Sequence, residues 1–186
     1  MDKQMTETIH TKIELKLIFL FIPIAYGSYL FHEFGHWIVG EILGNDMAYS
    51  LNYVWPKSGQ YIDSRHDLYV SIGGPAFTIL LSLIFLLIIE KYKTIYAYPV
   101  VFFQFFCRFF SIVFGGFSKQ DESRISVIAE LGTYTVAIAG LLILFLLVWR
   151  ASHILKVSLK NNGYFFTIST VCQLLVIGTY EFVLKQ

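Results

Sequence analysis

Three long stretches of the sequence contain no Asp, Glu, Lys or Arg: Leu68–Ile89, Leu131–Trp149 and Asn161–Tyr180. Each holds about 20 residues, the length of helix that crosses ~30 Å of hydrocarbon in a bilayer. In the whole chain 56% of residues are hydrophobic and 15% are charged, whereas soluble domains carry about 25% charged residues. A soluble enzyme, a secreted disulfide scaffold and a disordered chain are therefore excluded. The sequence predicts an α-helical polytopic membrane protein.

We expect about five transmembrane segments within a single membrane-embedded domain that covers residues 1–186. They are the apolar segments 15–43, 68–89, 95–117, 125–149 and 164–184. The charged turn Glu90–Thr94 is short, so the second and third segments should form an antiparallel pair of helices. A basic loop is expected over Arg150–Gly163, because it ends in the turn signal Asn-Asn-Gly.

The polar link between the first two segments carries a strand-like pattern. Residues Met47–Trp55 alternate and are rich in Tyr, Val and Trp, Pro56–Gly59 interrupts them, and Gln60–Ile62 resumes the pattern. This pattern predicts a short β-hairpin at the membrane surface, with its turn at Pro56–Gly59. An aromatic loop lying in the interface is the alternative interpretation.

An HExxH motif lies inside the first apolar segment, formed by His32, Glu33 and His36. Residues four apart share one helix face, so both imidazoles can bind one metal ion. Glu33 is offset by about 100° around the helix, where it can reach a water on that ion as a general base. This arrangement is typical of zinc hydrolases. Ionisable residues inside a membrane span also indicate function in their own right, because burying them there is costly.

A hydrolytic zinc ion usually has three protein ligands and one open position, so a third ligand must come from elsewhere. The first segment ends on one side of the membrane, and the next two segments lead out and back to the same side. They end just before Asp121 and Glu122. Asp121 is therefore the preferred third ligand, and Glu122, His66 and Asp67 are the alternatives.

These motifs together resemble the site-2 protease family of intramembrane zinc metalloproteases. The family pairs HExxH in one span with a Gly-Pro motif in the next, here Gly73-Gly74-Pro75, and with a later motif that often begins Asp-Gly. Here the later motif reads Asp121-Glu122-Ser123-Arg124-Ile125. His36 and Asp121 are 121 − 36 = 85 positions apart in the chain, which is similar to the spacing in short bacterial members.

The sequence departs from the family pattern at two functional positions. The family motif GPxxN has Asn where this chain has Thr78, so Gly74, Pro75 and Thr78 become candidates for contacting the substrate or the oxyanion. Glu122 stands where the family has glycine, and it is an alternative metal ligand. The resemblance implies a minimal catalytic core over about residues 15–149, with an extra C-terminal span over 164–184.

The resemblance implies a zinc-dependent endopeptidase of the bacterial cell membrane. Its partners would be the lipid bilayer and a transmembrane protein substrate that is cut in or near its span, and its cofactor would be Zn²⁺. The alternative is a non-proteolytic metal-binding membrane protein, either a metal transporter or an inactive family member that acts as a scaffold. A net charge of +1 without a basic stripe predicts no nucleic-acid partner.

Arg108 is an expensive residue for the middle of the third apolar segment. It can pair with Glu41, Glu122 or Glu130, or it can line the water path to the metal. It can also extend its charge to the membrane surface. Gln104 lies one helical turn earlier on the same face, which is consistent with a polar stripe along this segment.

Overall fold

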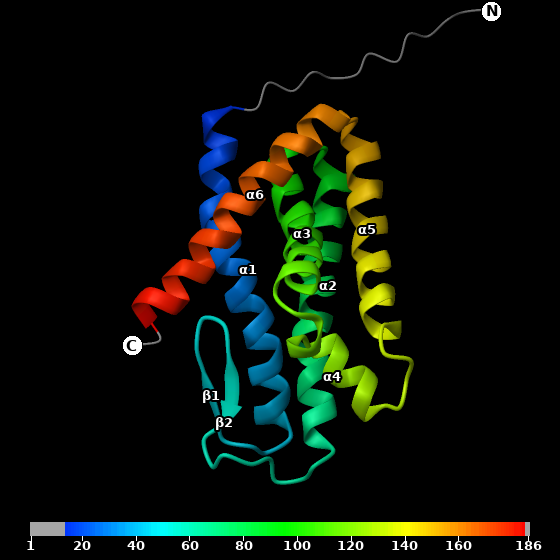
Figure 1. Cartoon of the computed structure of the whole chain (residues 1–186). Coiled ribbons are helices and arrows are strands. Elements are labelled where there is room, and N and C mark those ends of the chain that lie inside the picture. The colour runs from blue at the N-terminus through cyan, green and yellow to red at the C-terminus, as the bar shows by residue number, and fades with distance from the viewer. Residues whose placement is uncertain (1–13, 185–186) are drawn as a thin grey trace, which may run out of the picture.

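The structure is a computed structural model that describes residues 14–184, and it consists mainly of long helices (Figure 1). The predicted single domain also includes residues 1–13 and 185–186, which lie outside the described part. The principal helices are α1 (Leu15–Ile42), α2 (His66–Tyr92), α3 (Tyr98–Phe114), α4 (Asp121–Ile128), α5 (Thr135–Leu155) and α6 (Leu159–Thr179). Short helical turns are η1 (Ile95–Ala97), η2 (Phe117–Lys119) and the π-helical turn η3 (Tyr180–Leu184).

Five segments of the described chain are long and apolar enough to cross a membrane. They are α1, α2, η1 with α3, α5, and α6 with η3. Their outward faces stay apolar, since Leu87, Ile138 and Leu142 are each more than half exposed. Such extensive exposed apolar surface is expected when the surrounding solvent is lipid. The predicted class, a polytopic helical membrane protein with about five spans, is confirmed.

The fourth span begins later than the sequence predicted. The segment expected over 125–149 is divided into α4, a connection over 129–134, and α5. Glu130 adopts a left-handed backbone conformation (φ 53°) that ends the helical path. The expected basic loop over 150–163 is also wrong, because α5 continues to Leu155 and α6 begins at Leu159. The Ser158 hydroxyl caps α6 by accepting from the Asn161 amide.

A two-stranded antiparallel hairpin lies between α1 and α2, as predicted, but its turn is elsewhere. Strands β1 (Met47–Tyr49) and β2 (Val54–Pro56) pair with each other, so both lie within the stretch predicted to be one strand. The reversal occurs at Ser50–Tyr53, where the Ser50 amide and hydroxyl both donate to the Tyr53 carbonyl. The predicted turn at 56–59 exists, with the Gly59 amide donating to Pro56, but residues 60–62 do not form a strand.

The helices pack into one bundle (Figure 1). Helix α2 contacts α1, α3, α4 and α5, and α6 crosses obliquely over α1 and α3. Phe165 of α6 fills the crossing by packing against Phe21 of α1 and Tyr98 of α3, with ring centroids 5.7 and 5.4 Å apart. The hairpin lies beside the other half of α1, where the Tyr49 hydroxyl donates to the Leu30 carbonyl. This arrangement leaves the HExxH half of α1 between α2 and the hairpin.

Candidate metal centre

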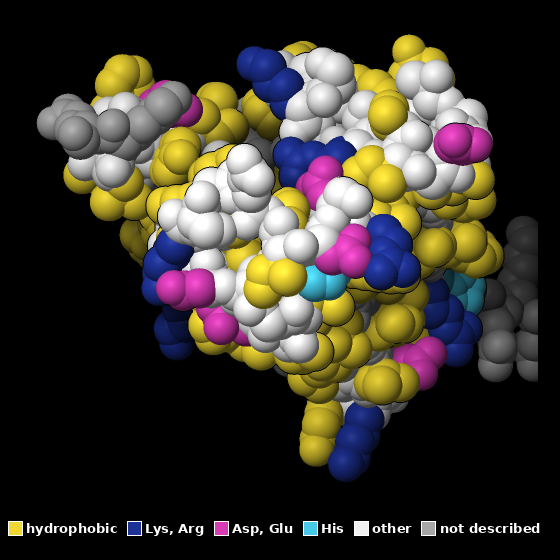
Figure 2. Space-filling model, turned by 90° about the horizontal axis from the view of Figure 1, so that it is seen from below, with side chains coloured by type: hydrophobic (Ala, Val, Ile, Leu, Met, Phe, Trp, Pro, Cys, Tyr) yellow, Lys and Arg dark blue, Asp and Glu magenta, His cyan; other side chains and the backbone are white. Residues whose placement is uncertain are grey.

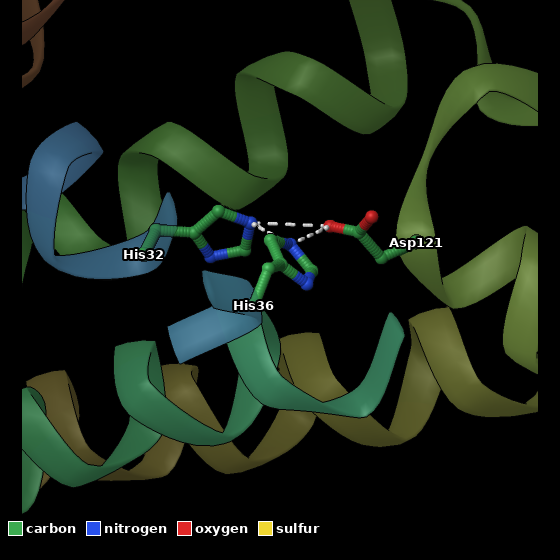
Figure 3. Close-up of side chains that lie close together, drawn as sticks. All are labelled: His32, His36 and Asp121. Carbon is green, nitrogen blue, oxygen red and sulfur yellow. Dashed lines mark hydrogen bonds and ion pairs between the residues drawn. The ribbon is translucent and has the colours of Figure 1, made fainter. Parts of the chain in front are cut away.

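The two histidines of the HExxH motif point to one place from a single face of α1 (Figure 3). Their Nε2 atoms are 3.2 Å apart, and the two rings are nearly perpendicular. His36 lies six residues before the end of α1 at Ile42, which corresponds to about 9 Å along the helix. The site is therefore inside the span but close to one end of it.

Asp121 reaches the histidines from the first residue of α4, as the preferred prediction expected. Its Oδ2 atom is 3.1 Å from Nε2 of His32 and 3.3 Å from Nε2 of His36. These three residues form a group that can hold a metal ion. Within residues 14–184, no other group of three or more His, Cys, Asp or Glu side chains lies close enough together to do so. The count of spans, which returns the chain to the side of His36, is thereby confirmed.

The alternative third ligands are occupied elsewhere. Glu122 binds Arg108, with 2.9 Å between Arg108 Nε and Oε1. His66 accepts from the side-chain amide of Asn45 at 3.1 Å, and Asp67 lies 3.7 Å from Arg124. None of the three joins the group that His32, His36 and Asp121 form.

The outward nitrogen of each imidazole has a partner that fixes its hydrogen. Nδ1 of His36 is 2.6 Å from the Val70 carbonyl, which can only accept, so this nitrogen donates. The Thr78 hydroxyl donates its one hydrogen to the Gly74 carbonyl, so it accepts from Nδ1 of His32 at 2.9 Å. Both Nε2 atoms are then left with a lone pair aimed at the common point, as metal-binding imidazoles require.

Close contact between α1 and α2 makes room for this geometry. A Cβ atom at Gly35 or Gly73 would collide with the backbone of the other helix, so the two glycines let the helices touch. A Cβ at Gly74 would overlap Nε2 of His36 and the ring of His32. The predicted Gly-Pro motif is thus located at the site, where Gly74 provides the space in which the imidazoles meet. Pro75 follows within α2.

A cavity of about 400 Å³ adjoins the three residues. It is lined by His32, Glu33, His36, Thr78, Gln104 and Arg108, among others. Glu33 is buried, and no protein group within the described residues hydrogen-bonds its carboxylate. The Glu33 carboxylate is therefore available to a molecule in this cavity. A second, larger cavity of about 780 Å³ shares Tyr53, Val54, Tyr61 and Arg124 with the first.

Charge at the site is arranged around Asp121. Arg108 is buried and also contacts Asp121, with Nη2 3.1 Å from Oδ2. The pairing of Arg108 with Glu122 was one of the predicted alternatives. The alternative that Arg108 extends its charge to the membrane surface is wrong, because its side chain is buried. When Glu33, Asp121 and Glu122 are ionised, these three carboxylates and one guanidinium leave two negative charges, which suits a divalent cation.

Seen along the bundle from the end that holds this site, the molecule gathers acidic and basic side chains on its end face, with hydrophobic side chains around them (Figure 2). The site thus lies near the polar end of the bundle. Sequence reasoning missed the Val70 carbonyl, since a backbone acceptor leaves no signal in the residue type.

Comparisons of the chain with protein-family models, curated proteins and solved structures found no match.

Proposed function

We propose that this chain is an intramembrane zinc metalloendopeptidase that hydrolyses peptide bonds in or near transmembrane segments of other proteins. The observation that carries the proposal is the convergence of two oriented imidazoles and the Asp121 carboxylate beside a cavity that also exposes Glu33. The same residues carry the resemblance to the site-2 protease family, whose short bacterial members have a similar spacing. We therefore place the protein in the bacterial cell membrane.

The spacing of the ligand atoms supports zinc. Their separations of 3.1, 3.2 and 3.3 Å describe a nearly equilateral triangle. Tetrahedral zinc with bonds of about 2.0–2.2 Å separates neighbouring ligand atoms by about 3.3–3.6 Å, close to these values. Magnesium and calcium favour sets made of oxygen ligands, whereas two imidazoles and one carboxylate suit zinc. Held there, zinc would polarise a peptide carbonyl and make a water more acidic.

Glu33 is the proposed general base. Its carboxylate lines the cavity and is buried. Because bulk water does not screen a buried carboxylate, its interaction with a water on the metal is stronger than at the surface. The carboxylate accepts a proton from the attacking water and then delivers it to the leaving amine of the cut peptide bond. Within residues 14–184 no protein group hydrogen-bonds this carboxylate, which leaves it available for both proton transfers.

Thr78 contacts a metal-binding histidine in addition to the role expected for it. Its hydroxyl hydrogen is directed to the Gly74 carbonyl and its oxygen accepts from His32, so it positions a ligand in this state of the protein. A role of Gly74, Pro75 or Thr78 toward the substrate or the oxyanion stays a prediction.

The hairpin offers a backbone edge to an unwound substrate. In the antiparallel register, Ala48 and Trp55 form a hydrogen-bonded pair between the strands, so the amide and carbonyl of Val54 point away from β1. Val54 lines both cavities. A substrate strand paired there would satisfy its backbone groups inside the membrane while it lies near the metal.

A cleavage assay in proteoliposomes tests the proposal. The probes are single-span model peptides with a Gly or Pro near the middle of the span, and products are identified by mass spectrometry. Wild type should cut at least one probe, whereas Glu33→Gln should retain its zinc and cut none. The matched control is Glu130→Gln, at an exposed position in the connection before α5, which should cut like wild type. Equal cleavage by Glu33→Gln would refute the proposal, and absence of cleavage with bound zinc in wild type would favour the transporter or scaffold.

A further inference from the structure

Arg108 is held by two carboxylates within a membrane span. Its side chain is about one-tenth exposed, and Nε donates to Glu122 Oε1 at 2.9 Å. Nη2 reaches Glu122 Oε2 at 3.4 Å and Asp121 Oδ2 at 3.1 Å. The planar fork of the guanidinium therefore bridges two adjacent residues at the start of α4, which a lysine could not do in the same way.

The element that carries Asp121 needs such a bridge. Helix α4 has eight residues and stands outside the five candidate spans. Six residues connect it to α3, among them Gly116 with φ 88°, and no side chain caps its N-terminus. A metal ligand on so short a helix is easily displaced, and Arg108 ties the ligand to the long helix α3.

The two carboxylates also compete for Arg108. The Asp121 oxygen that Arg108 contacts is Oδ2, the same atom that faces both imidazoles. Without another partner, the Arg108 guanidinium would pair fully with Asp121. The negative charge of Asp121 would then be less available to a metal. Glu122 takes the shorter bond and most of the fork, which leaves Asp121 with a single contact from Arg108.

We propose that Arg108 and Glu122 act as one positioning pair, which holds the Asp121 carboxylate toward the imidazoles and keeps its negative charge available to the metal. The inference rests on the metal site of the proposed function but not on proteolysis. It implies that either residue weakens metal binding when the other is removed, because its charge is then unmatched. Without Glu122, Arg108 competes for the ligand, and without Arg108, Glu122 repels Asp121 at the mouth of the site.

The test is a double-variant cycle on zinc affinity, measured by competition with a chelator on the full-length protein in detergent. We expect Arg108→Gln and Glu122→Gln each to weaken zinc binding by about tenfold or more, in the range found for partners of metal ligands. The double variant should bind within about threefold of wild type, because neither unmatched charge remains. Glu90→Gln and Arg150→Gln serve as controls, since their pair at 3.1 Å is partly exposed and remote from the site; neither should change zinc affinity.

A second readout separates positioning from general destabilisation. The visible absorption of Co²⁺ bound in place of zinc reports the ligand geometry, so it should change in both single variants and return in the double variant. Where Arg108→Gln does not give a monodisperse protein, Arg108→Lys keeps the charge without the fork and should still weaken binding. Additive losses in the double variant, or single variants that bind like the controls, would overturn the pair. A wild type without metal affinity would overturn both the pair and the metal site, whereas zinc binding without cleavage would overturn the peptidase alone.

Discussion

The two ends of the bundle are packed by different means. At the metal end, around His32, His36, Gly74 and Asp121, the helices touch through glycines and the side chains are fixed by individual hydrogen bonds. At the aromatic end, α6 is seated on α1 and α3 through the rings around Phe165. Since lipid offers helices little hydrophobic drive to associate, both ends depend on close fit. However, the metal end depends in addition on where single ligand atoms lie.

This difference separates two kinds of mutational effect. A small change at the metal end should alter metal affinity strongly while it removes or adds only a few atoms. A larger change of volume at the aromatic end should lower stability and leave affinity alone. The following substitutions test that separation, starting with the one expected to have the largest effect.

Gly74→Ala should abolish metal binding. The added methyl would overlap the ring of His32 and Nε2 of His36, so the two ligands could no longer meet. We expect affinity to fall by more than about a hundredfold, beyond the tenfold to hundredfold that loss of an outer hydrogen-bond partner causes. Zinc content after purification and chelator competition measure it.

The matched control for Gly74→Ala is Gly140→Ala in α5, where an added Cβ meets nothing within 4 Å. It should bind zinc like wild type and should be slightly more stable, since alanine favours helix over glycine. Wild-type affinity in Gly74→Ala would show that the imidazoles do not converge beside α2.

Thr78→Val should weaken metal binding less than Gly74→Ala does. Valine keeps the shape of threonine but removes the acceptor for Nδ1 of His32, so the ring loses its fixed orientation. We expect a loss of about tenfold to hundredfold in zinc affinity. In the control Thr170→Val, the lost hydroxyl also bonds the carbonyl one turn earlier, that of Phe166, but it is far from the site. Equal affinity in both variants would remove Thr78 from the metal centre.

The metal end was largely predictable because its signals are periodic or topological. The spacing of HExxH places two histidines on one helix face whatever surrounds them. The out-and-back path of two spans returns Asp121 to the side of the membrane on which His36 lies. Neither inference needs knowledge of packing. The choice between Asp121 and Glu122 did need it, because adjacent carboxylates look alike until Arg108 is seen to take one of them.

The errors in the fold arose where two local signals compete. Both Ser50–Tyr53 and Pro56–Gly59 are turns in the structure, and the sequence does not show which of them joins paired strands. The Asn45 side chain helps to decide it, because its Oδ1 accepts from the Ile62 amide and holds residue 62 beside the end of α1 instead of in a strand. The predicted segment 125–149 likewise satisfies a length criterion, although it includes Glu130, whose left-handed backbone conformation separates α4 from α5.

Val54→Pro should slow cleavage while zinc affinity stays unchanged. Proline removes the outward amide of β2, the donor available to a substrate backbone, and a hydrogen bond is worth about 1 kcal/mol. A loss of that size slows the reaction roughly fivefold. The control Val54→Ala shortens the side chain but keeps the amide, so it should cut at nearly the wild-type rate. If both variants cut equally fast, the edge of the hairpin does not bind the substrate.

Phe165→Leu should have the smallest effect on the metal and a visible effect on stability. Leucine loses the ring contacts with Phe21, Tyr98 and Phe102, whose centroids lie 5.4–5.9 Å away. We expect a destabilisation of about 1–2 kcal/mol, seen as a lower melting temperature in detergent, with zinc affinity within about twofold of wild type. Phe19→Leu, at an exposed position of α1, is the control and should change neither quantity. A large loss of zinc affinity in Phe165→Leu would show that the two ends are coupled, since Phe21 and His36 are 15 residues apart on the same helix, about 22 Å along its axis.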